Sequence, residues 1–197
     1  MPVAGRRAPR ALQVGARAFL RRPAPADERE FLARARASRP LHRGLALPPL
    51  THPQFVHFLR LADSPLNELH LLCRREDGAM CGVLNLSDIR REPLQSANLG
   101  YYALAPFAGQ GYMSEGVQLV LRQAFVRLKL HRVEASVQPD NAASIRLIQR
   151  SGFHEEGFSR RMVRIGGRWR DHLRFAILAE DWRALRASSP PQSRGGS

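Results

Sequence analysis

Hydrophobic residues recur at helical spacing in two segments of the first third of the chain. They predict one helix over residues 27–38 and a second in "HPQFVHFLRLA", where the hydroxyl of Thr51 can cap the N-terminus. The proline-bearing "RPLHRGLALPPL" between them predicts a loop. Ahead of both helices, "GARAFLRR" predicts a first strand at residues 15–22.

The middle of the chain changes to strand-like patterns. "NELHLLCRRE" and "AMCGVLNLSDI" flank the dipeptide Asp77-Gly78, which indicates a hairpin whose two turn residues both take a positive φ. A looser turn around "REPLQSA" leads into a third strand, "NLGYYALAP", which ends before Pro106. We expect these three strands to be antiparallel neighbours.

The period then returns to that of a helix. Over residues 114–130 the apolar positions follow the 3.6-residue repeat, and "HRVEASV" then alternates as a strand with Val133, Ala135 and Val137 on one face. Strand, glycine-bearing turn, helix and strand therefore form a βαβ unit over residues 98–137.

One helix and one hairpin follow. "AASIRLIQRSGF" predicts a helix that ends at Gly152, and "GFSRRMVRI", the turn "GG" and "RWRDHLRFAIL" predict a closing hairpin. The chain has 197 residues, 44% of them hydrophobic, which is enough for one core. We therefore expect an α/β (α+β) domain over residues 15–184, a disordered basic arm at 1–14 and a disordered tail at 185–197.

The charge of the chain is strongly positive. Lysine and arginine total 31 against 17 acidic residues, which gives a formal net charge of +14. Such a field favours anionic partners, including RNA, the ribosome and phosphate-bearing cofactors, although abundant arginine can also reflect genome composition. Six arginines and no acid occur in the first 22 residues. We interpret this leader as a disordered arm, with a mitochondrial-type transit segment as the alternative.

Composition argues against several classes of protein. No apolar stretch approaches the roughly 20 residues of a membrane-spanning helix, and the N-terminus lacks the hydrophobic block of a secretory signal. We expect a cytoplasmic protein without a membrane partner. Cys73 and Cys81 are too few for a disulfide framework or a zinc site, so we expect buried thiols and no metal. His131 and His172 are interpreted as structural.

The stretch "FAGQGYMSEG" places Gly109 and Gly111 directly before a helix. A helix start offers unpaired N–H groups and the positive end of the dipole, and glycine lets a diphosphate approach the backbone closely. On the local pattern alone, a simple chain reversal explains the glycines equally well. The stretch lacks the Gly-Lys-Ser/Thr of nucleoside-triphosphate loops, and its preceding strand follows a hairpin, unlike the first strand of a dinucleotide fold.

The chain resembles the GCN5-related N-acetyltransferases (GNAT), and specifically the Rim-type ribosomal-protein N-terminal acetyltransferases. The resemblance lies in "NLGYYALAPFAGQGYMSEGVQLVL", "HRVEASVQPDNAASIRLIQRSGFHEEGF" and "GGRWRDHLRFAILAEDW". It runs from about Gly15 to Trp182 and is most specific from Gly100 onward. It implies the GNAT fold, a mixed, mostly antiparallel sheet with splayed central strands flanked by helices, and acetyl-CoA as co-substrate.

The resemblance also implies positions for the cofactor. The backbone of Ala103, Leu104 and Ala105 would pair with the pantetheine arm. Asn141 would contact the cofactor near that arm, and Ser144 would lie near the thiol. The diphosphate would be held by Gly109, Gln110, Gly111, Tyr112, Met113 and Ser114.

Three positions depart from the family pattern. Ala108 stands where glutamine or arginine is usual before the first glycine. Ile148 stands where many relatives carry a proton-donating tyrosine, which excludes tyrosine chemistry at that place. Val163 is the nearest equivalent of a glutamate that some Rim-type enzymes use, so the identity of the general base is left open.

Attack of an amine on a thioester requires a neutral amine, an oxyanion donor and a proton for the departing sulfur. An α-amino group, with a pKa of about 7.7 to 8.0, is partly neutral near pH 7, so a weak base suffices. The Leu104 backbone N–H is our candidate oxyanion donor. Ser144 is our candidate proton donor, unless its hydroxyl bonds back to its own helix turn. Candidate bases are Glu134, otherwise a solvated or arginine-paired residue, and Tyr101 or Tyr102, of which at most one should face the cleft.

The acceptor site is the least specified part. Asn85 and Ser87 are candidates for lining it, unless they satisfy hairpin backbone groups. Trp169 and Asp171 are interpreted as packing and hairpin residues. The leading function is acetyl transfer to the N-terminal amine of a protein, with a ribosomal protein as the expected acceptor. The alternatives are a small amine such as a polyamine or aminoglycoside, which a basic surface disfavours, and a non-catalytic RNA- or ribosome-binding module.

Overall fold

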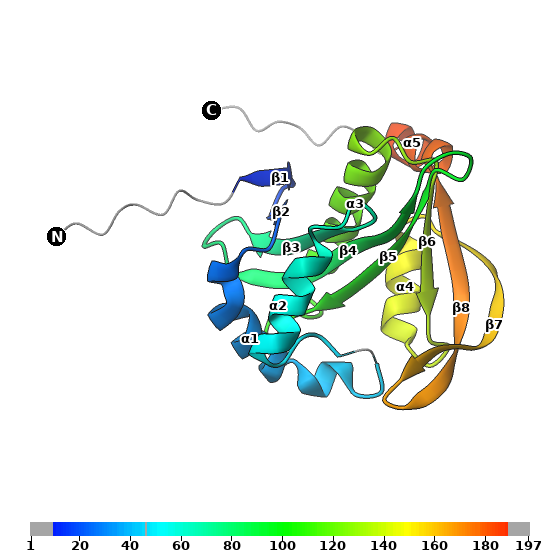
Figure 1. Ribbon diagram of the computed structural model, residues 1–197. Coiled ribbons are helices and arrows are strands. Elements are labelled where there is room, and N and C mark those ends of the chain that lie inside the picture. The colour runs from blue at the N-terminus through cyan, green and yellow to red at the C-terminus, as the bar shows by residue number, and fades with distance from the viewer. Residues whose placement is uncertain (1–9, 46, 189–197) are drawn as a thin grey trace, which may run out of the picture.

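One eight-stranded sheet organises the protein. The computed structural model describes residues 10–45 and 47–188 (Figure 1). The strands are β1 (Ala11–Val14), β2 (Ala18–Arg21), β3 (Glu68–Arg74), β4 (Met80–Arg90), β5 (Ser96–Ala103), β6 (Arg132–Val137), β7 (His154–Ile165) and β8 (Arg168–Leu178). The α-helices are α1 (Glu28–Ala37), α2 (His52–Leu61), α3 (Tyr112–Arg122), α4 (Ala142–Arg150) and α5 (Ala179–Ser188). Shorter turns of helix are Pro25–Asp27, Arg39–His42 and the π-helical Gln123–Arg127 that continues α3.

The strand order is β1-β2-β3-β4-β5-β6-β8-β7. β5 and β6 run parallel, and every other neighbouring pair is antiparallel. The parallel pair requires a crossover, which α3 supplies on one face of the sheet, as the predicted βαβ unit requires. The mixed, mostly antiparallel sheet confirms the predicted fold class.

Helices cover both faces of the sheet, and each face has its own core (Figure 1). Phe31 of α1 and the α2 residues Phe55 and Phe58 pack against β3 and β4 on one face. On the other face, α3 contributes Val117, Val120 and Leu121, and the other helices add Ile148 and Trp182. The alternating side chains of the strands, divided between these two cores, hold the sheet as the middle layer.

Most predicted elements lie where the pattern placed them. Both N-terminal helices, the three central strands and the closing hairpin are present, and α4 ends at Arg150, two residues before Gly152, whose φ is +95°. At the start of α2, the predicted hydrogen bond to the Thr51 hydroxyl is not formed; the Oε1 of Gln54 instead accepts from the Thr51 N–H at 3.2 Å. α3 begins at Tyr112, two residues before the predicted start.

The domain is longer at both ends than we predicted. Residues 11–14, assigned to the arm, form β1, which pairs with β2 and is tied to the C-terminal end of α3 because Gln13 donates to Gln123 at 3.0 Å. Residues 185–188, assigned to the tail, continue α5, which buries Trp182 in the core. The remaining parts of the predicted arm and tail, 1–9 and 189–197, lie outside the described residues.

The hairpin turn at Asp77-Gly78 is wider than the predicted two-residue turn. Of the two residues only Gly78 has a positive φ, of +75°, and the ladder closes between Arg74 and Ala79, with the N–H of Arg74 donating at 2.9 Å. The Asp77 carboxylate accepts from the Arg74 guanidinium at 2.9 Å and from the Ala79 N–H at 3.0 Å. These bonds stabilise a four-residue loop, and the two-residue prediction was therefore wrong.

The described residues show three further features. Cys73 and Cys81 are free and buried, and burial raises the pKa of the Cys73 thiol to about 11. No cluster of three or more potential metal-ligating side chains occurs among residues 10–45 and 47–188. Within the same residues, no helix is both long and apolar enough to span a membrane.

Candidate active site where the sheet opens

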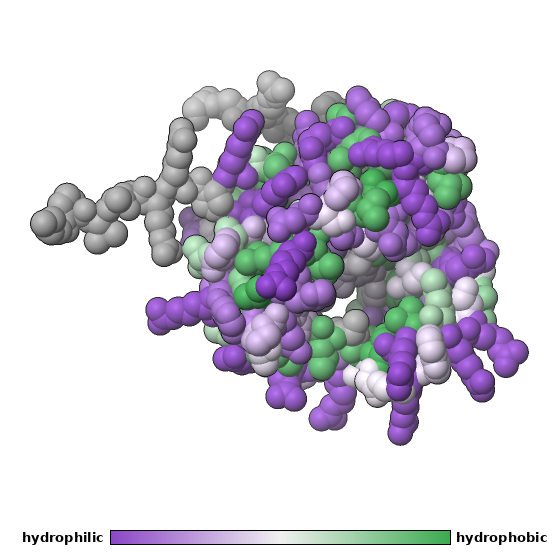
Figure 2. Space-filling model, viewed as in Figure 1, coloured by the Kyte–Doolittle hydropathy of each residue, from purple (hydrophilic) through white to green (hydrophobic). Residues whose placement is uncertain are grey.

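The sheet splits between its two parallel strands. β5 and β6 are in register only from Ser96 to Asn98, paired with Arg132 to Glu134. Beyond that point β5 stays paired with β4 as far as Ala103, and β6 stays paired with β8 as far as Val137. The two halves of the sheet therefore part, and two cavities of about 310 Å³ and 320 Å³ lie at the opening. A hollow is visible between the α1–α2 side and the β7–β8 side of the surface (Figure 2).

Seven of the predicted cofactor residues line the first of these cavities. They come from the end of β5, the start of α3 and the start of α4, which are far apart in sequence: Ala103, Gly109, Gly111, Met113, Ser114, Asn141 and Ser144. The side chains of Gln110 and Tyr112 have structural partners instead. Gln110 donates to the Pro106 carbonyl at 3.0 Å, and the Tyr112 ring packs edge-on against Phe107.

The start of α3 carries no side-chain cap. Gly109 and Gly111 have φ values of +77° and +82°, so the turn itself requires glycine, and nothing lies within 4 Å of a Cβ built at Gly109. The helix ladder begins with the Glu115 N–H donating to the Gly111 carbonyl at 3.3 Å. The N–H groups of residues 112–114 are therefore left as donors at the positive end of the helix. This open cradle fits a diphosphate.

Arg17 adds a positive charge beside this cradle, which the sequence pattern did not reveal. Its Nη1 donates to the Gln110 carbonyl at 3.2 Å, and its guanidinium lies 4.4 Å from the centre of the Tyr112 ring. Glu115 fixes the backbone there, because its Oε1 accepts from the N–H of Arg17 at 2.9 Å and of Ala18 at 3.2 Å. A residue 93 positions away from Gln110 in sequence is thus placed at the helix mouth.

The backbone at the end of β5 corrects one prediction. The Leu104 N–H donates to the Cys81 carbonyl at 2.8 Å, so it faces β4 and is not available as an oxyanion donor. The Ala105 N–H is also occupied, by the Ser38 hydroxyl at 2.8 Å. Because ladder bonds alternate along an antiparallel pair, the N–H of Ala103 points the other way, toward the opening. Ala103 therefore replaces Leu104 as the candidate donor.

Tyr101, Ser144 and Asn141 form a connected group on the cavity wall. The Tyr101 hydroxyl is hydrogen-bonded to the Ser144 hydroxyl, so Ser144 does not bond back to its own helix turn. Asn141 caps α4, because its Oδ1 accepts from the Ser144 N–H at 3.1 Å. Burial raises the pKa of Tyr101 to about 12, which keeps the phenol protonated at neutral pH. A tyrosine hydroxyl thus reaches the site from β5, although Ile148 occupies the family position.

Of the remaining candidates, Tyr102 and Asn85 lie at the cavities, whereas Glu134 and Ser87 do not. Tyr101 packs against one core and Tyr102 against the other, so the two rings point to opposite sides of the sheet as expected, although both residues line both cavities. Burial raises the pKa of Tyr102 strongly, and its hydroxyl and the Asn85 Oδ1 are buried without a hydrogen-bond partner among the described residues. Glu134 and Ser87 line neither cavity. Glu134 instead accepts from the Arg132 Nε at 2.7 Å, which removes it as a base.

His42 is a site residue that the sequence analysis missed. It lies at the end of the helical turn Arg39–His42, borders both cavities and is only 4% exposed. Its Nε2 is 3.0 Å from the Ala103 carbonyl, an acceptor, so Nε2 carries the proton and Nδ1 is bare in the neutral ring. Burial lowers the pKa of His42, and its Nδ1 has no hydrogen-bond partner among the described residues. No local motif marks this histidine, because tertiary packing brings it to β5.

Other predicted residues lie at the margin. His172 is buried, lines the second cavity and contacts the Arg170 carbonyl at 3.1 Å. Asp171 accepts from the Arg161 N–H at 2.6 Å, a hairpin contact. Trp169 was expected to pack, but its side chain is 60% exposed. His131 is exposed and lies 3.2 Å from Glu180 on α5.

Two curated bacterial relatives match parts of the chain. A probable N-acetyltransferase of Bacillus subtilis, YjcK, is 45% identical over 53% of this chain and 58% of its own length. The [ribosomal protein uS5]-alanine N-acetyltransferase of Escherichia coli is 32% identical over 54% of this chain and 55% of its own length. The matched segments thus span little more than half of each relative.

Solved structures match over most of the chain. Mycobacterium smegmatis RimJ in complex with CoA-disulfide superimposes with a TM-score of 0.73 at 27% identity, covering 87% of this chain and 88% of that one. A Vibrio cholerae spermidine N-acetyltransferase with CoA and spermine gives a TM-score of 0.73 at 19% identity, covering 85% and 98%, a likeness of fold alone. Residues 17–154 match the acetyltransferase (GNAT) domain family, and the chain therefore belongs to that family.

Proposed function

We propose that the protein transfers the acetyl group of acetyl-CoA to the N-terminal α-amine of a protein, by direct attack in a ternary complex. The observation that carries this proposal is the opening between β5 and β6, with the uncapped start of α3 on one side and the Tyr101–Ser144 pair on the other. Backbone N–H groups that can bind an anion, and a hydroxyl that can donate a proton, thus border one cavity of about 310 Å³.

The cofactor would be held by backbone donors. The N–H groups of residues 112–114 would bind the diphosphate, and Arg17 beside them would add charge. Ala108, which stands where the family usually has glutamine or arginine, would cost such a site little affinity, because the phosphate contacts come from main-chain N–H groups. Bound acetyl-CoA would supply an activated thioester.

His42 acts as the base in this proposal. Its bond to the Ala103 carbonyl fixes the tautomer and leaves a lone pair on Nδ1. Because Nδ1 is buried, the ring must shift when the acceptor binds before this lone pair can take a proton from its amine. The lowered pKa of His42 keeps the ring neutral near pH 7, in the form that can accept a proton. A weak base suffices here, since an α-amine with a pKa of about 7.7 to 8.0 is already partly neutral.

Two other groups act on the thioester end of the site. The Ala103 N–H, directed into the opening, donates to the developing oxyanion. Ser144 donates its proton to the departing sulfur and takes the Tyr101 proton through the hydrogen bond between them. The proton that His42 took from the amine then returns through solvent to Tyr101, so that both groups regain their starting protonation state. The net transfer is therefore one proton from the amine nitrogen to the sulfur. Asn141 holds the backbone of Ser144 in place.

The acceptor is assigned from the relatives and from charge. The E. coli relative is named for a ribosomal-protein alanine, which supports a protein N-terminus and makes a ribosomal protein the expected acceptor. A polyamine, the ligand in the V. cholerae neighbour, carries several positive charges and would be repelled by a chain of net charge +14. An RNA- or ribosome-binding module without turnover would leave the Tyr101–Ser144 pair without a role.

A charge change in the cradle tests the cofactor site. Asparagine and aspartate both tolerate a positive φ and have nearly the same shape, so Gly109→Asn is the matched control for Gly109→Asp. Acetyl-CoA at about 100 times its Kd should stabilise the wild type by about 2.7 kcal/mol, which raises Tm by roughly 5–10 °C. We expect Gly109→Asn to keep most of this shift and Gly109→Asp to lose most of it.

Labelled acetyl-CoA then tests the reaction. We expect transfer of label to peptides with a free N-terminal alanine and no transfer to the same peptides with a blocked N-terminus. Equal thermal shifts in the two Gly109 variants would contradict the cofactor placement. A normal shift without label transfer to any N-terminal peptide would contradict the proposed activity.

A further inference from the structure

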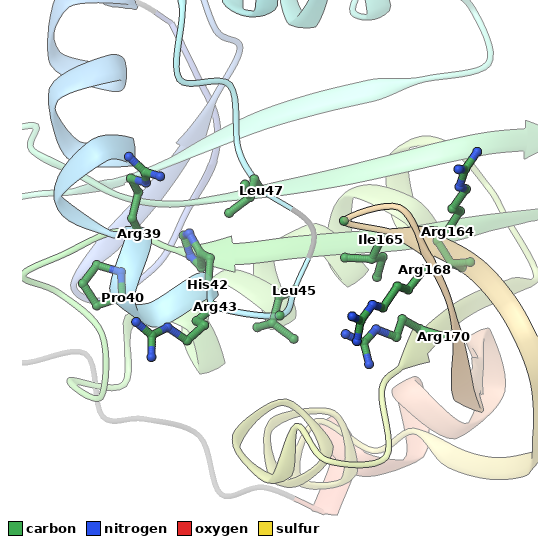
Figure 3. Close-up of a pocket in the computed structure, with 13 residues that line it drawn as sticks. Arg39, Pro40, His42, Arg43, Leu45, Leu47, Arg164, Ile165, Arg168 and Arg170 are labelled. Atoms are coloured by element: carbon green, nitrogen blue, oxygen red, sulfur yellow. The ribbon is translucent and has the colours of Figure 1, made fainter.

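A third and larger cavity, of about 1020 Å³, lies beside the proposed active site (Figure 3). One wall is the turn Arg39–His42 with the loop that follows it, and the other is the tip of the β7–β8 hairpin. Figure 3 shows Arg168 and Arg170 pointing from the hairpin toward Leu45. Five arginines line the cavity, two from the first wall and three from the second: Arg39, Arg43, Arg164, Arg168 and Arg170.

These arginines have no counter-ion in the described part of the chain. No aspartate or glutamate is among the described residues that line the cavity, and none of the five forms a salt bridge with a described residue. Some other arginines of the fold do have an acidic partner, as in Arg21–Asp27 at 2.7 Å. The Nε of Arg170 is buried and has no acceptor among the described residues. Guanidinium groups gathered in this way favour an anionic ligand.

The arginine cavity adjoins the reaction site. His42 and Leu45 line both this cavity and the two at the opening of the sheet. The loop between them is anchored to the end of β6, because the Gln138 Nε2 donates to the Gly44 carbonyl at 3.1 Å. A ligand that lies among the arginines therefore reaches His42 without crossing any other element.

We propose that the arginine cavity binds an acidic peptide segment that directly follows the acceptor's N-terminal residue, so that the enzyme selects N-termini by negative charge. This inference rests on the proposed function and names its substrate class. Leu45, Leu47 and Ile165 give the cavity apolar surface between the arginines, which suits a peptide with mixed side chains. No phenylalanine, tyrosine or tryptophan is among its described lining residues, so a single-stranded RNA would find none of the large aromatic rings on which bases stack.

Three peptides test the selection. They begin with alanine and continue with three aspartates or glutamates, with three glutamines, or with three lysines. We expect kcat/KM to fall in that order at low salt, with at least about tenfold between the acidic and the neutral peptide. Raising the salt concentration should reduce the advantage of the acidic peptide, because screening weakens the attraction.

Charge reversal locates the effect. Arg168→Glu should lower kcat/KM for the acidic peptide by roughly tenfold, and should improve the lysine peptide, while the neutral peptide changes less than about twofold. Arg160→Glu is the matched control, because Arg160 is exposed on β7 of the same hairpin but does not line the cavity. The acetyl-CoA thermal shift of both variants should equal that of the wild type, which reports correct folding.

Fluorescence anisotropy of labelled peptides separates this inference from the proposed function. Tighter binding of the acidic peptide, lost in Arg168→Glu, would support the cavity as a binding site even if no peptide were acetylated. Equal binding and equal kcat/KM for all three peptides would overturn the inference and leave the acetyltransferase proposal intact. Displacement of the acidic peptide by a short single-stranded RNA that binds more tightly through Arg168 would also overturn it.

Discussion

At the scale of single residues, His42 shows how a fold prepares a base. Its ring is almost fully buried, and its hydrogen bond to the Ala103 carbonyl fixes the proton on Nε2. Burial makes the charged ring costly and lowers its pKa. The ring edge of Tyr102, 5.7 Å away between centroids, adds no opposite charge. The result is a neutral imidazole whose bare nitrogen, Nδ1, is buried in a residue that lines the cavities at the opening of the sheet.

Replacing His42 by glutamine should expose this role. Glutamine keeps an N–H donor for Ala103 and loses the basic nitrogen, so we expect kcat/KM to fall by about 100-fold. In the wild type, His42 must be neutral and the α-amine must lose a proton. A plot of log kcat/KM against pH should therefore rise with a slope of 2 below the pKa of His42, which lies under 6.5, and with a slope of 1 above it.

The variant should show a slope of 1 over the whole acid range, because only the α-amine titrates. His172→Gln is the control, since His172 borders only the second of the two cavities. A slope of 2 retained in His42→Gln, or an equal loss of activity in His172→Gln, would contradict the assignment of His42 as the base.

At the scale of elements, the start of α3 is fixed by a contact with β2. A glutamate in the first turn of a helix usually stabilises the positive end of the helix dipole. Here the Oε1 of Glu115 accepts hydrogen bonds from the N–H groups of Arg17 and Ala18. A Cβ at Gly15 would lie 2.1 Å from the same oxygen, so glycine is needed for this approach. The first strands of the chain thereby carry Arg17 to the helix mouth and leave the α3 donors uncapped.

Arg17→Gln should weaken the cofactor site without affecting the acceptor site. We expect the KM for acetyl-CoA to rise about fivefold to tenfold, since the change removes one charge near the diphosphate, and the KM for the peptide to change less than about twofold. Arg29→Gln on the exposed face of α1 is the control. An unchanged KM for acetyl-CoA would show that Arg17 only packs on Tyr112.

At the scale of the whole molecule, a buried histidine in β3 makes the stability of the fold depend on pH. His70 of β3 is completely buried and contacts the Leu84 carbonyl on β4 at 3.0 Å. Burial, with a smaller effect from Arg22, lowers the pKa of His70 to about 4. The Glu68 carboxylate, 3.4 Å from Nε2, would favour the charged ring, but burial is the larger effect. The unfolded chain, with a pKa near 6.5, therefore binds this proton more readily than the folded one.

Stability should fall as the pH drops from about 6.5 toward 4. In this window the unfolded state gains a proton that the folded state excludes, so the free energy of unfolding decreases, by about 3 kcal/mol at pH 4. We expect His70→Asn, which keeps a donor for Leu84, to flatten the curve between pH 7 and 4 in urea unfolding. His57→Asn on the exposed face of α2 should leave the wild-type slope. Parallel curves for wild type and His70→Asn would contradict this account.

The sequence alone determined the elements and their order. Local patterns placed the helices and strands of the domain, the βαβ unit and the glycine turn, because period, caps and turn residues act within a few positions of one another. Together with the family resemblance, they located Gly109, Gly111, Asn141 and Ser144 at one cavity. Where they failed, as with β1 and the last turn of α5, the deciding contacts were with residues far away along the chain.

Only the tertiary structure decided which groups face the reaction. The direction of the Leu104 N–H depends on the register of β5 against β4, and the pairing of Glu134 with Arg132 depends on how those side chains pack. His42, Arg17 and the five arginines of the third cavity come from segments that no local pattern connects. The periodicity of a chain shows which face of an element is buried. Whether a nitrogen keeps a free lone pair, or an arginine lacks an acidic partner, depends on how distant elements pack together.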